Sequence, residues 1–144
     1  MYYYDPYVYR SFAQDQLIAN IARAVNGQYT AIACYERLAN MAPNQEEKEQ
    51  IMEIRNDEIR HFRTFSQIYA SLTGRQPSYQ IVEQCPSEYR EGLLFAFKDE
   101  QKTADFYQDI AEQAPHPYIK EQFRRASADE QNHAVWFLYF LTRR

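Results

Sequence analysis

Two short clusters of the sequence combine residue types that could bind a metal ion. "NDEIRHF" covers residues 56–62, and "ADEQNHA" covers residues 128–134. Each places a His three residues after a Glu: Glu58 with His61, and Glu130 with His133. On a helix, residues three apart lie on the same side, so each pair could contact one ion. The alternative is ordinary charged helix surface, which a lone Glu-x-x-His would not distinguish from a site.

The two clusters recur at a fixed offset of 72 residues. The same offset matches Tyr35 with Tyr107, and Ala42-Pro43 with Ala114-Pro115, without a gap. A repeat of this kind indicates that the two halves of the chain are duplicated copies. Because both Glu-His pairs and the Asp before each Glu fall on this repeat, we favour a duplicated ligand set over chance surface charge.

Proline and glycine divide the chain into four long segments that should each be a helix. The breakers leave segments free of internal proline at about 11–42, 45–73, 87–114 and 117–143. At 1.5 Å per residue each helix would be roughly 40 Å long. Asn44 with Glu47, Gly74 and Ser87 are candidate helix caps. The sequence therefore predicts an all-α four-helix bundle.

The connections between these segments predict the topology. The first and third junctions are tight Ala-Pro turns, which join antiparallel helices. The middle junction, "GRQPSYQIVEQCP", could extend about 40 Å and cross the length of the bundle. We expect two antiparallel hairpins joined by this crossover in one domain, residues 11–144. A Tyr-rich arm without helical period, residues 1–10, precedes it.

The candidate ligands lie on the helix faces that should point inward. Seam positions spaced three and four apart are otherwise apolar, yet Glu58, Glu100 and Glu130 occupy them at mid-helix. Burying a carboxylate costs several kcal/mol unless it is paired, protonated or bound to a cation. A divalent metal between the two hairpins would supply the missing positive charge.

Composition and charge exclude several other classes of partner. The formal net charge is −4 and no polybasic tract is present, so neither nucleic acid nor a membrane surface is expected as a partner. No apolar run reaches the roughly 20 residues of a membrane span. Cys34 and Cys85 form no CxxC pair, so we expect no disulfide framework and no rubredoxin-type iron centre. Cys34 should be a small packed thiol, Cys85 could be exposed, and the cytoplasm is the expected location.

The chain resembles the ferritin-like superfamily, and within it the rubrerythrin-like di-iron carboxylate proteins without a rubredoxin domain. The resemblance covers residues from about 12 to 143. Proteins of this kind take one Glu from each of two helices and a Glu-x-x-His from each of the other two. Glu58 with His61 and Glu130 with His133 match the paired motifs, and Glu100 matches one single Glu. The other single Glu would stand at position 28, where this sequence has Gln.

The resemblance implies a role for each matched residue. Two metal ions, Fe or Mn with Zn as an alternative, would be bridged by Glu58 and Glu130. His61 would bind one ion, and His133 with Glu100 the other. Asp57 and Asp129 resemble aspartates that orient a His of the opposite hairpin, which predicts Asp57 with His133 and Asp129 with His61; the alternative is helix-surface charge. Tyr35 and Tyr107 lie two turns along the seam from positions 28 and 100, where they would pack in the core or take part in redox chemistry.

The neutral amide of Gln28 leaves three carboxylates where the family has four. The ion beside Gln28 and His61 should therefore bind more weakly. Two functions follow as alternatives. One is a di-iron protein, an oxidoreductase reacting with dioxygen or peroxide or a handler of iron, with an external electron donor and assembled as a homodimer. The other is a structural protein, for example of a spore coat, with a vestigial or merely stabilising site.

Overall fold

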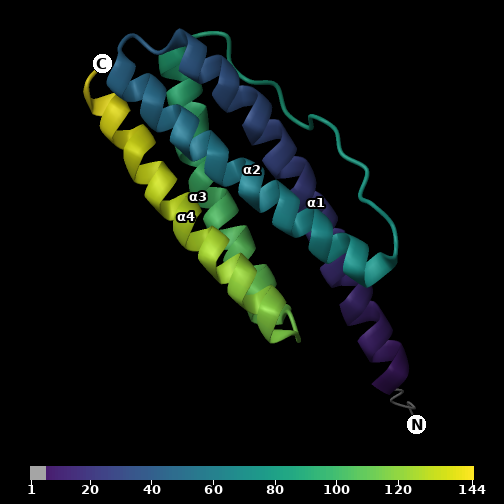
Figure 1. The fold of residues 1–144 in the computed structure, drawn as a ribbon. Helices are drawn as coiled ribbons and strands as arrows, with labels where there is room; N and C mark the ends of the chain where they lie inside the picture. The colour runs from purple at the N-terminus through teal and green to yellow at the C-terminus, as the bar shows by residue number, and fades with distance from the viewer. Residues whose placement is uncertain (1–5) are drawn as a thin grey trace.

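Four helices account for most of the chain. The structure, a computed structural model, describes residues 6–144, with side chains described from residue 12. Its helices are α1 (Pro6–Met41), α2 (Gln45–Thr73), α3 (Tyr89–Gln113) and α4 (Pro117–Thr142) (Figure 1). No strand occurs in this range. Within the same range, no helix combines the length and the apolar character needed to cross a membrane.

The predicted helix ends agree with the structure except at the starts of α1 and α3. Asn44 Oδ1 accepts a hydrogen bond from the backbone N–H of Glu47 at 2.9 Å, and Gly74 ends α2 with φ 74°. The expectation that Ser87 caps α3 was wrong, because Glu88 holds the N-cap position without a side-chain cap. α1 begins at Pro6 rather than near residue 11, since proline fits the first helical turn, where its missing N–H removes no bond. The remainder of the predicted arm, residues 1–5, lies outside the described residues.

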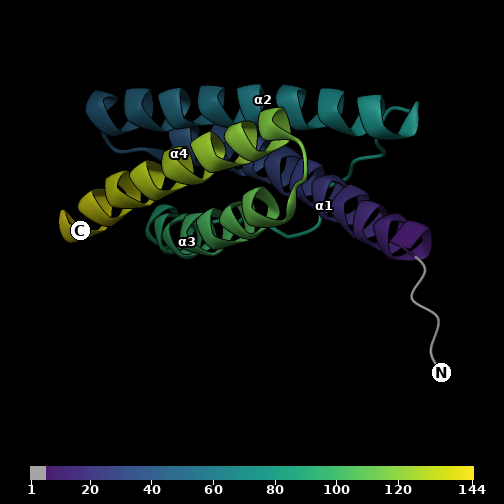
Figure 2. The same cartoon turned by 90° about the horizontal axis from the view of Figure 1, so that it is seen from below.

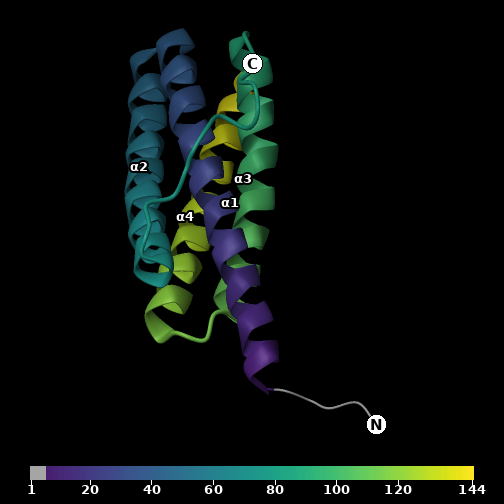
Figure 3. The ribbon, with the colours of Figure 1, turned by 90° about the vertical axis from the view of Figure 1, so that its right-hand side faces the viewer.

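The topology is hairpin, crossover, hairpin, as predicted. α1 pairs with α2, and α3 pairs with α4. The crossover, residues 74–88, runs along the outside of the bundle from the end of α2 to the start of α3 (Figures 1 and 3). Viewed from below, α2 and α3 lie at opposite sides of the bundle, with α1 and α4 between them (Figure 2). The predicted duplication agrees with this pairing and stays a prediction.

The core consists of two apolar clusters with a layer of polar side chains between them. The first core cluster lies toward the α3–α4 turn and contains Leu17, Ile21, Ala24, Val25, Phe65, Ile68, Tyr107, Ile110, Ala111, Ala114, Ile119, Phe123 and Ala126. The second lies toward the α1–α2 turn and contains Ala31, Cys34, Tyr35, Leu38, Ala39, Ile51, Ile54, Leu93, Ala96, Phe137 and Phe140. All four helices contribute to both clusters. The polar layer therefore sits at mid-bundle, held in place by close packing on either side.

A disulfide joins the crossover to α1, which corrects the expectation of two free thiols. Cys34 and Cys85 are bonded, with their Cα atoms 5.2 Å apart. The two residues are 51 positions apart in the sequence, so no local motif reveals the pair. They meet because the crossover runs back along α1, and this path depends on the tertiary fold.

Candidate metal centre

Six buried side chains, at least one from each helix, form the polar layer. None is more than 5% exposed. The residues of the polar layer are Gln28 on α1, Glu58 and His61 on α2, Glu100 on α3, and Glu130 and His133 on α4. The structure thus brings together all six residues that the sequence predicted as ligands or weak ligands.

An aspartate of the opposite hairpin holds each histidine ring in place. His61 Nε2 lies 2.9 Å from Asp129 Oδ2, and His133 Nε2 lies 2.8 Å from Asp57 Oδ2. The predicted pairing of Asp57 with His133 and Asp129 with His61 is confirmed. With Nε2–H donating to the aspartate, the Nδ1 atom of each ring faces the layer, where its lone pair could bind a metal.

Arg60, which the sequence analysis missed, links these two aspartates. Its guanidinium lies 3.0 Å from Asp57 Oδ1 and 3.1 Å from Asp129 Oδ2. The Asp57 carboxyl has a lowered pKa, chiefly because His133 donates a hydrogen bond to it. Burial would raise the pKa of Asp129, but His61 and Arg125 outweigh that effect and lower it to about 2. Both aspartates are therefore anions at neutral pH and can orient the histidines.

The inward-facing atoms of the layer crowd around a shared space. His133 Nδ1 is 3.1 Å from Glu58 Oε1 and 3.4 Å from Glu100 Oε2. His61 Nδ1 is 3.0 Å from Glu130 Oε1. Despite these short distances, among the described residues none of the following atoms has a hydrogen-bond partner of acceptable geometry: Gln28 Oε1, Glu58 Oε1, His61 Nδ1, Glu100 Oε2, Glu130 Oε1 and His133 Nδ1.

These six atoms fit a metal centre, since buried polar atoms otherwise find hydrogen-bond partners. Glu47, buried to 0% exposure elsewhere in the bundle, shows how this chain satisfies a structural carboxylate. It is hydrogen-bonded by Asn44, Tyr89 and Arg144. The polar layer lacks such partners, and its oxygen and imidazole donors suit divalent first-row metals.

The protonation of the layer reflects the crowding of its charges. Burial, together with the negative charges of Glu100 and Glu58, raises the pKa of Glu130 well above its usual range. Burial would lower the pKa of His133, but the hydrogen bond to Asp57 and the nearby carboxylates of Glu100 and Glu58 raise it to about 12. Protons thus supply the positive charge that a bound cation would otherwise provide.

The two halves of the layer are not equivalent. Glu58, Glu100, Glu130 and His133 each offer one ligand atom, and these four atoms all lie within 4.8 Å of one another. His61 is not part of that group, and Gln28 offers a neutral amide oxygen in place of a carboxylate. The side of the layer with Glu100 therefore has the tighter set of anionic donors.

Two buried tyrosines end the layer on opposite sides and contact different partners. Tyr35 Oη donates to Glu100 Oε1 at 2.5 Å. Tyr107 Oη instead accepts a hydrogen bond from Gln28 Nε2, which leaves the Gln28 oxygen free. Burial, followed by the nearby carboxylates, raises the pKa of both phenols well above the usual value. The sequence placed these tyrosines on the seam but could not reveal their hydroxyl partners.

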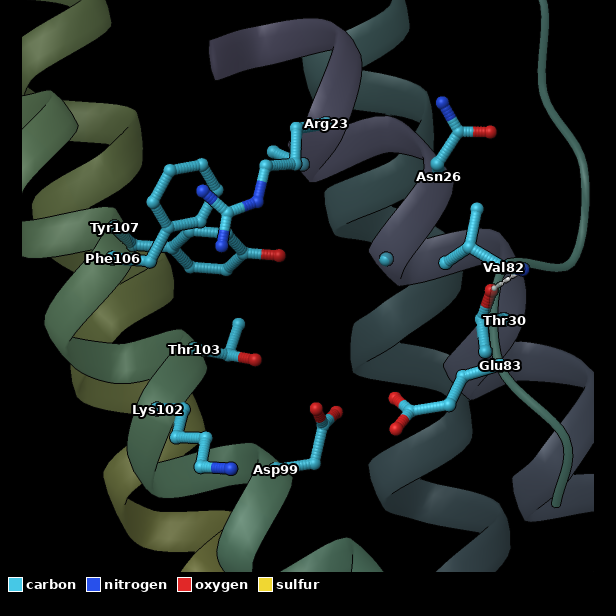
Figure 4. Close-up of a pocket in the computed structure, with 12 residues that line it drawn as sticks. Arg23, Asn26, Thr30, Val82, Glu83, Asp99, Lys102, Thr103, Phe106 and Tyr107 are labelled. Atoms are coloured by element: carbon cyan, nitrogen blue, oxygen red, sulfur yellow. Dashed lines mark hydrogen bonds between the residues drawn. The ribbon is translucent and has the colours of Figure 1, made fainter.

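A cavity of about 540 Å³ adjoins the layer on the side of Gln28. It lies between α1, α3 and the crossover, and Arg23, Asn26, Thr30, Glu83, Asp99 and Tyr107 are among its lining residues (Figure 4). The phenol of Tyr107 contacts both the cavity and Gln28. This cavity could not be predicted from the sequence, because the crossover forms one of its walls and the path of the crossover depends on the tertiary fold.

Comparisons with known proteins agree with this geometry. The Rubrerythrin family model matches residues 91–144. A Bacillus subtilis (strain 168) protein named "Uncharacterized protein YhjR" is 48% identical over 143 residues, which is 99% of each chain. The chain belongs to the rubrerythrin-type proteins of the ferritin-like superfamily. The family match ends at the last residue and includes Glu100, Glu130 and His133.

Solved structures confirm the ferritin-like fold. A ferritin-like diiron-carboxylate protein from Bacillus anthracis str. Ames superposes with a TM-score of 0.77 at 24% identity, covering 90% of this chain and 97% of that one. The bacterioferritin of Desulfovibrio desulfuricans, whose structure describes a diiron site, superposes with a TM-score of 0.80 at 18% identity. The match covers 92% of this chain and 82% of that one. A hypothetical protein from Pyrococcus furiosus superposes with a TM-score of 0.77 at 19% identity, covering 88% of both chains. At these identities the likeness supports the fold alone.

Proposed function

We propose that this rubrerythrin-type protein binds two divalent metal ions, iron first among them with Mn or Zn as alternatives, and uses them in redox chemistry with dioxygen or peroxide or in the handling of iron. The observation that carries the proposal is the set of six buried, inward-facing atoms without hydrogen-bond partners among the described residues. The proposal also draws on the diiron sites named for two proteins of the same fold.

In this proposal each side chain of the layer has a defined task. Glu58 and Glu130 would contribute to holding both ions, His133 and Glu100 would hold one of them, and His61 with the neutral oxygen of Gln28 would hold the other. Asp57 and Asp129 keep Nε2 of each ring protonated, so that Nδ1 is the atom that binds. A bound iron pair supplies the ability to exchange electrons with an oxidant. Tyr35 holds Glu100 in place through its hydroxyl.

The two positions should differ in affinity. Glu58, Glu100, Glu130 and His133 already converge on one position, whereas the position beside Gln28 has a neutral oxygen in place of a carboxylate. A neutral oxygen offsets less of the charge of a divalent ion. We therefore expect one ion to bind tightly and the second to bind more weakly.

Metal titration with matched variants tests this proposal. Gln28→Glu should raise the affinity of the weaker ion at least tenfold, while Glu100→Gln, the equivalent change at the repeat position, should weaken the tighter one. Elemental analysis of protein purified without oxygen, and calorimetric titration with Fe²⁺ and Co²⁺, give stoichiometry and affinity. Two equally tight ions that Gln28→Glu leaves unchanged would contradict the asymmetry.

Addition of peroxide to the Fe²⁺-loaded protein separates the redox function from a scaffold. Visible absorption monitors the oxidation of the bound iron. Oxidation within seconds supports the redox function. Absence of stoichiometric metal would favour the structural alternative.

Several expectations from the sequence stay predictions: an external electron donor, a homodimer, a cytoplasmic location and any spore association. Sedimentation equilibrium tests the dimer.

A further inference from the structure

Two hydrogen bonds and a disulfide hold the crossover against one face of α1. Asn26 Oδ1 accepts from the backbone N–H of Gln80 at 2.8 Å, and Thr30 Oγ1 accepts from that of Val82 at 3.0 Å. The disulfide is Cys34–Cys85. Positions 26, 30 and 34 are four apart, so these side chains form one row along the helix.

Apolar burial contributes little to holding this part of the crossover. The side chains of Ile81 and Val82 are 55% and 59% exposed, although both are apolar. Tyr79 packs on Tyr29 with ring centroids 4.8 Å apart, which anchors the segment before Gln80. Between Val82 and the start of α3, the disulfide is therefore the main attachment to α1.

The same stretch of the crossover forms a wall of the cavity beside the polar layer. Val82 and Glu83 line one side of the cavity, and Asp99 and Tyr107 of α3 line the other (Figure 4). Tyr107 in turn bonds Gln28, at the proposed weaker metal position. The cavity is already partly open to the solvent, and movement of the crossover away from α1 would open it further.

We propose that Cys34–Cys85 is a redox-active disulfide that small dithiols reduce, and that its reduction releases the crossover and opens the cavity beside Gln28. Cys34 is buried and Cys85 is only half-buried. An external thiolate therefore attacks Cys85 Sγ, the Cys34–Cys85 bond breaks, and Cys34 leaves as a thiolate that takes a proton. The second thiol of the reductant then attacks the reductant's first sulfur, which is bonded to Cys85 in the mixed disulfide. The bond to Cys85 breaks, and Cys85 leaves as a thiolate that takes a proton.

The reaction balances as a two-electron exchange. The dithiol loses two electrons and two protons and becomes a disulfide, and the protein gains them as two thiols. With both thiols free, the contacts that remain are two hydrogen bonds from crossover N–H groups to α1 side chains and the ring contact between Tyr29 and Tyr79. The consequence for metal rests on the proposed function, whereas the release of the crossover does not.

Hydrogen exchange measured by mass spectrometry tests the release directly. At short labelling times, reduction with dithiothreitol should raise exchange several-fold in peptides covering residues 76–88, leave α4 unchanged because its amides exchange only when the whole bundle unfolds, and reverse on reoxidation. The Cys34→Ser/Cys85→Ser double variant should exchange like the reduced protein, and its exchange should not change when the reductant is added. Unchanged exchange in the crossover, a rise of equal size over the whole chain at these short times, or two free thiols in protein purified in air would overturn the proposal.

The rate of metal uptake tests the opening of the cavity. After removal of the reductant without oxygen, Co²⁺ should bind to the reduced protein several-fold faster than to the oxidised protein, with the same final stoichiometry. Equal rates would overturn the control of access. If neither form binds Co²⁺, the proposed metal centre fails, and hydrogen exchange still decides whether the disulfide holds the crossover.

Discussion

Tyr35 and Tyr107 occupy equivalent positions of the repeat, but their hydroxyls meet different chemical groups. Tyr35 donates to the carboxylate of Glu100, whereas Tyr107 accepts from the amide of Gln28. A hydrogen bond to a charged group contributes about 1.5–3 kcal/mol, and one between neutral groups about 0.5–1.5 kcal/mol. The single exchange of Glu for Gln at position 28 thus changes the tyrosine beside it as well as the ligand set.

This difference predicts unequal costs for two matched substitutions. In metal-free protein, Tyr35→Phe should lower the free energy of unfolding by about 1.5–3 kcal/mol, because buried Glu100 loses its donor. Tyr107→Phe should lower it by about 0.5–1.5 kcal/mol. Urea unfolding followed by circular dichroism measures both. Equal costs would indicate that the Tyr35–Glu100 bond has no special strength.

Protons and metal compete for the same atoms of the polar layer. The pKa of His133 is raised to about 12, and that of Glu130 lies well above its usual range. Below these pKa values both groups hold protons, and metal binding must release them. Affinity should therefore rise with pH, by up to about tenfold per unit for each proton released.

Titration with Co²⁺ at about pH 6, 7 and 8, together with an indicator dye in weak buffer, measures the affinity and the protons released. The expected result is tighter binding at higher pH, with protons released into the solution. Affinity independent of pH, with no release, would show that the layer holds no displaceable protons and would contradict the assigned protonation.

At the scale of the helices, the two glycines of the helical interiors have opposite surroundings. A Cβ at Gly27 would have no heavy atom within 4 Å, whereas a Cβ at Gly92 would lie 2.2 Å from Leu38 Cδ2. Leu38 is fully buried, so it has little room to move. Gly92 thus permits the close approach of α3 to α1, and Gly27 has no such role in packing.

Alanine at these two positions should therefore change stability in opposite directions. Gly27→Ala should raise the free energy of unfolding by about 0.5–1 kcal/mol, because alanine loses less backbone entropy in a helix. Gly92→Ala gains the same term but overpacks the core, at a cost of about 1–3 kcal/mol. Thermal unfolding of the two variants beside the parent protein measures both changes. A stabilised Gly92→Ala variant would mean that Leu38 moves aside at little cost.

The helices and their order could be predicted because local patterns specify them. Prolines bound the segments, Asn44 and Gly74 cap α2, and the apolar seam sets the inward face. The metal-binding candidates were predictable for the same reason, since helical spacing and the repeat align Glu58, Glu130 and their histidines. The start of α3 was less predictable, because its N-cap Glu88 makes no side-chain hydrogen bond.

Features that depend on how separate segments meet could not be predicted. Arg60 joins two aspartates from different hairpins, and a single-helix pattern does not show such a contact. The disulfide and the cavity both depend on the path of the crossover along α1. A stretch without periodicity carries no information on that path, so Cys34 and Cys85 gave no sign of pairing.

At the scale of the whole molecule, the disulfide closes a loop that contains the end of α1, all of α2 and most of the crossover. The bonded residues are 51 positions apart. A cross-link over a loop of this length restricts the unfolded chain and stabilises the fold by about 4 kcal/mol in the chain-entropy estimate. The bond should therefore affect the stability of the entire bundle in addition to the local attachment of the crossover.

Urea unfolding with and without reductant should show this loss of stability. Reduction should lower the free energy of unfolding by about 4 kcal/mol, and the Cys34→Ser/Cys85→Ser variant should lose a similar amount and no longer respond to reductant. Because the effect acts on the unfolded state, the circular dichroism of the folded protein should be unchanged on reduction. A reduced protein as stable as the oxidised one would mean that strain in the folded state offsets the restriction of the unfolded chain.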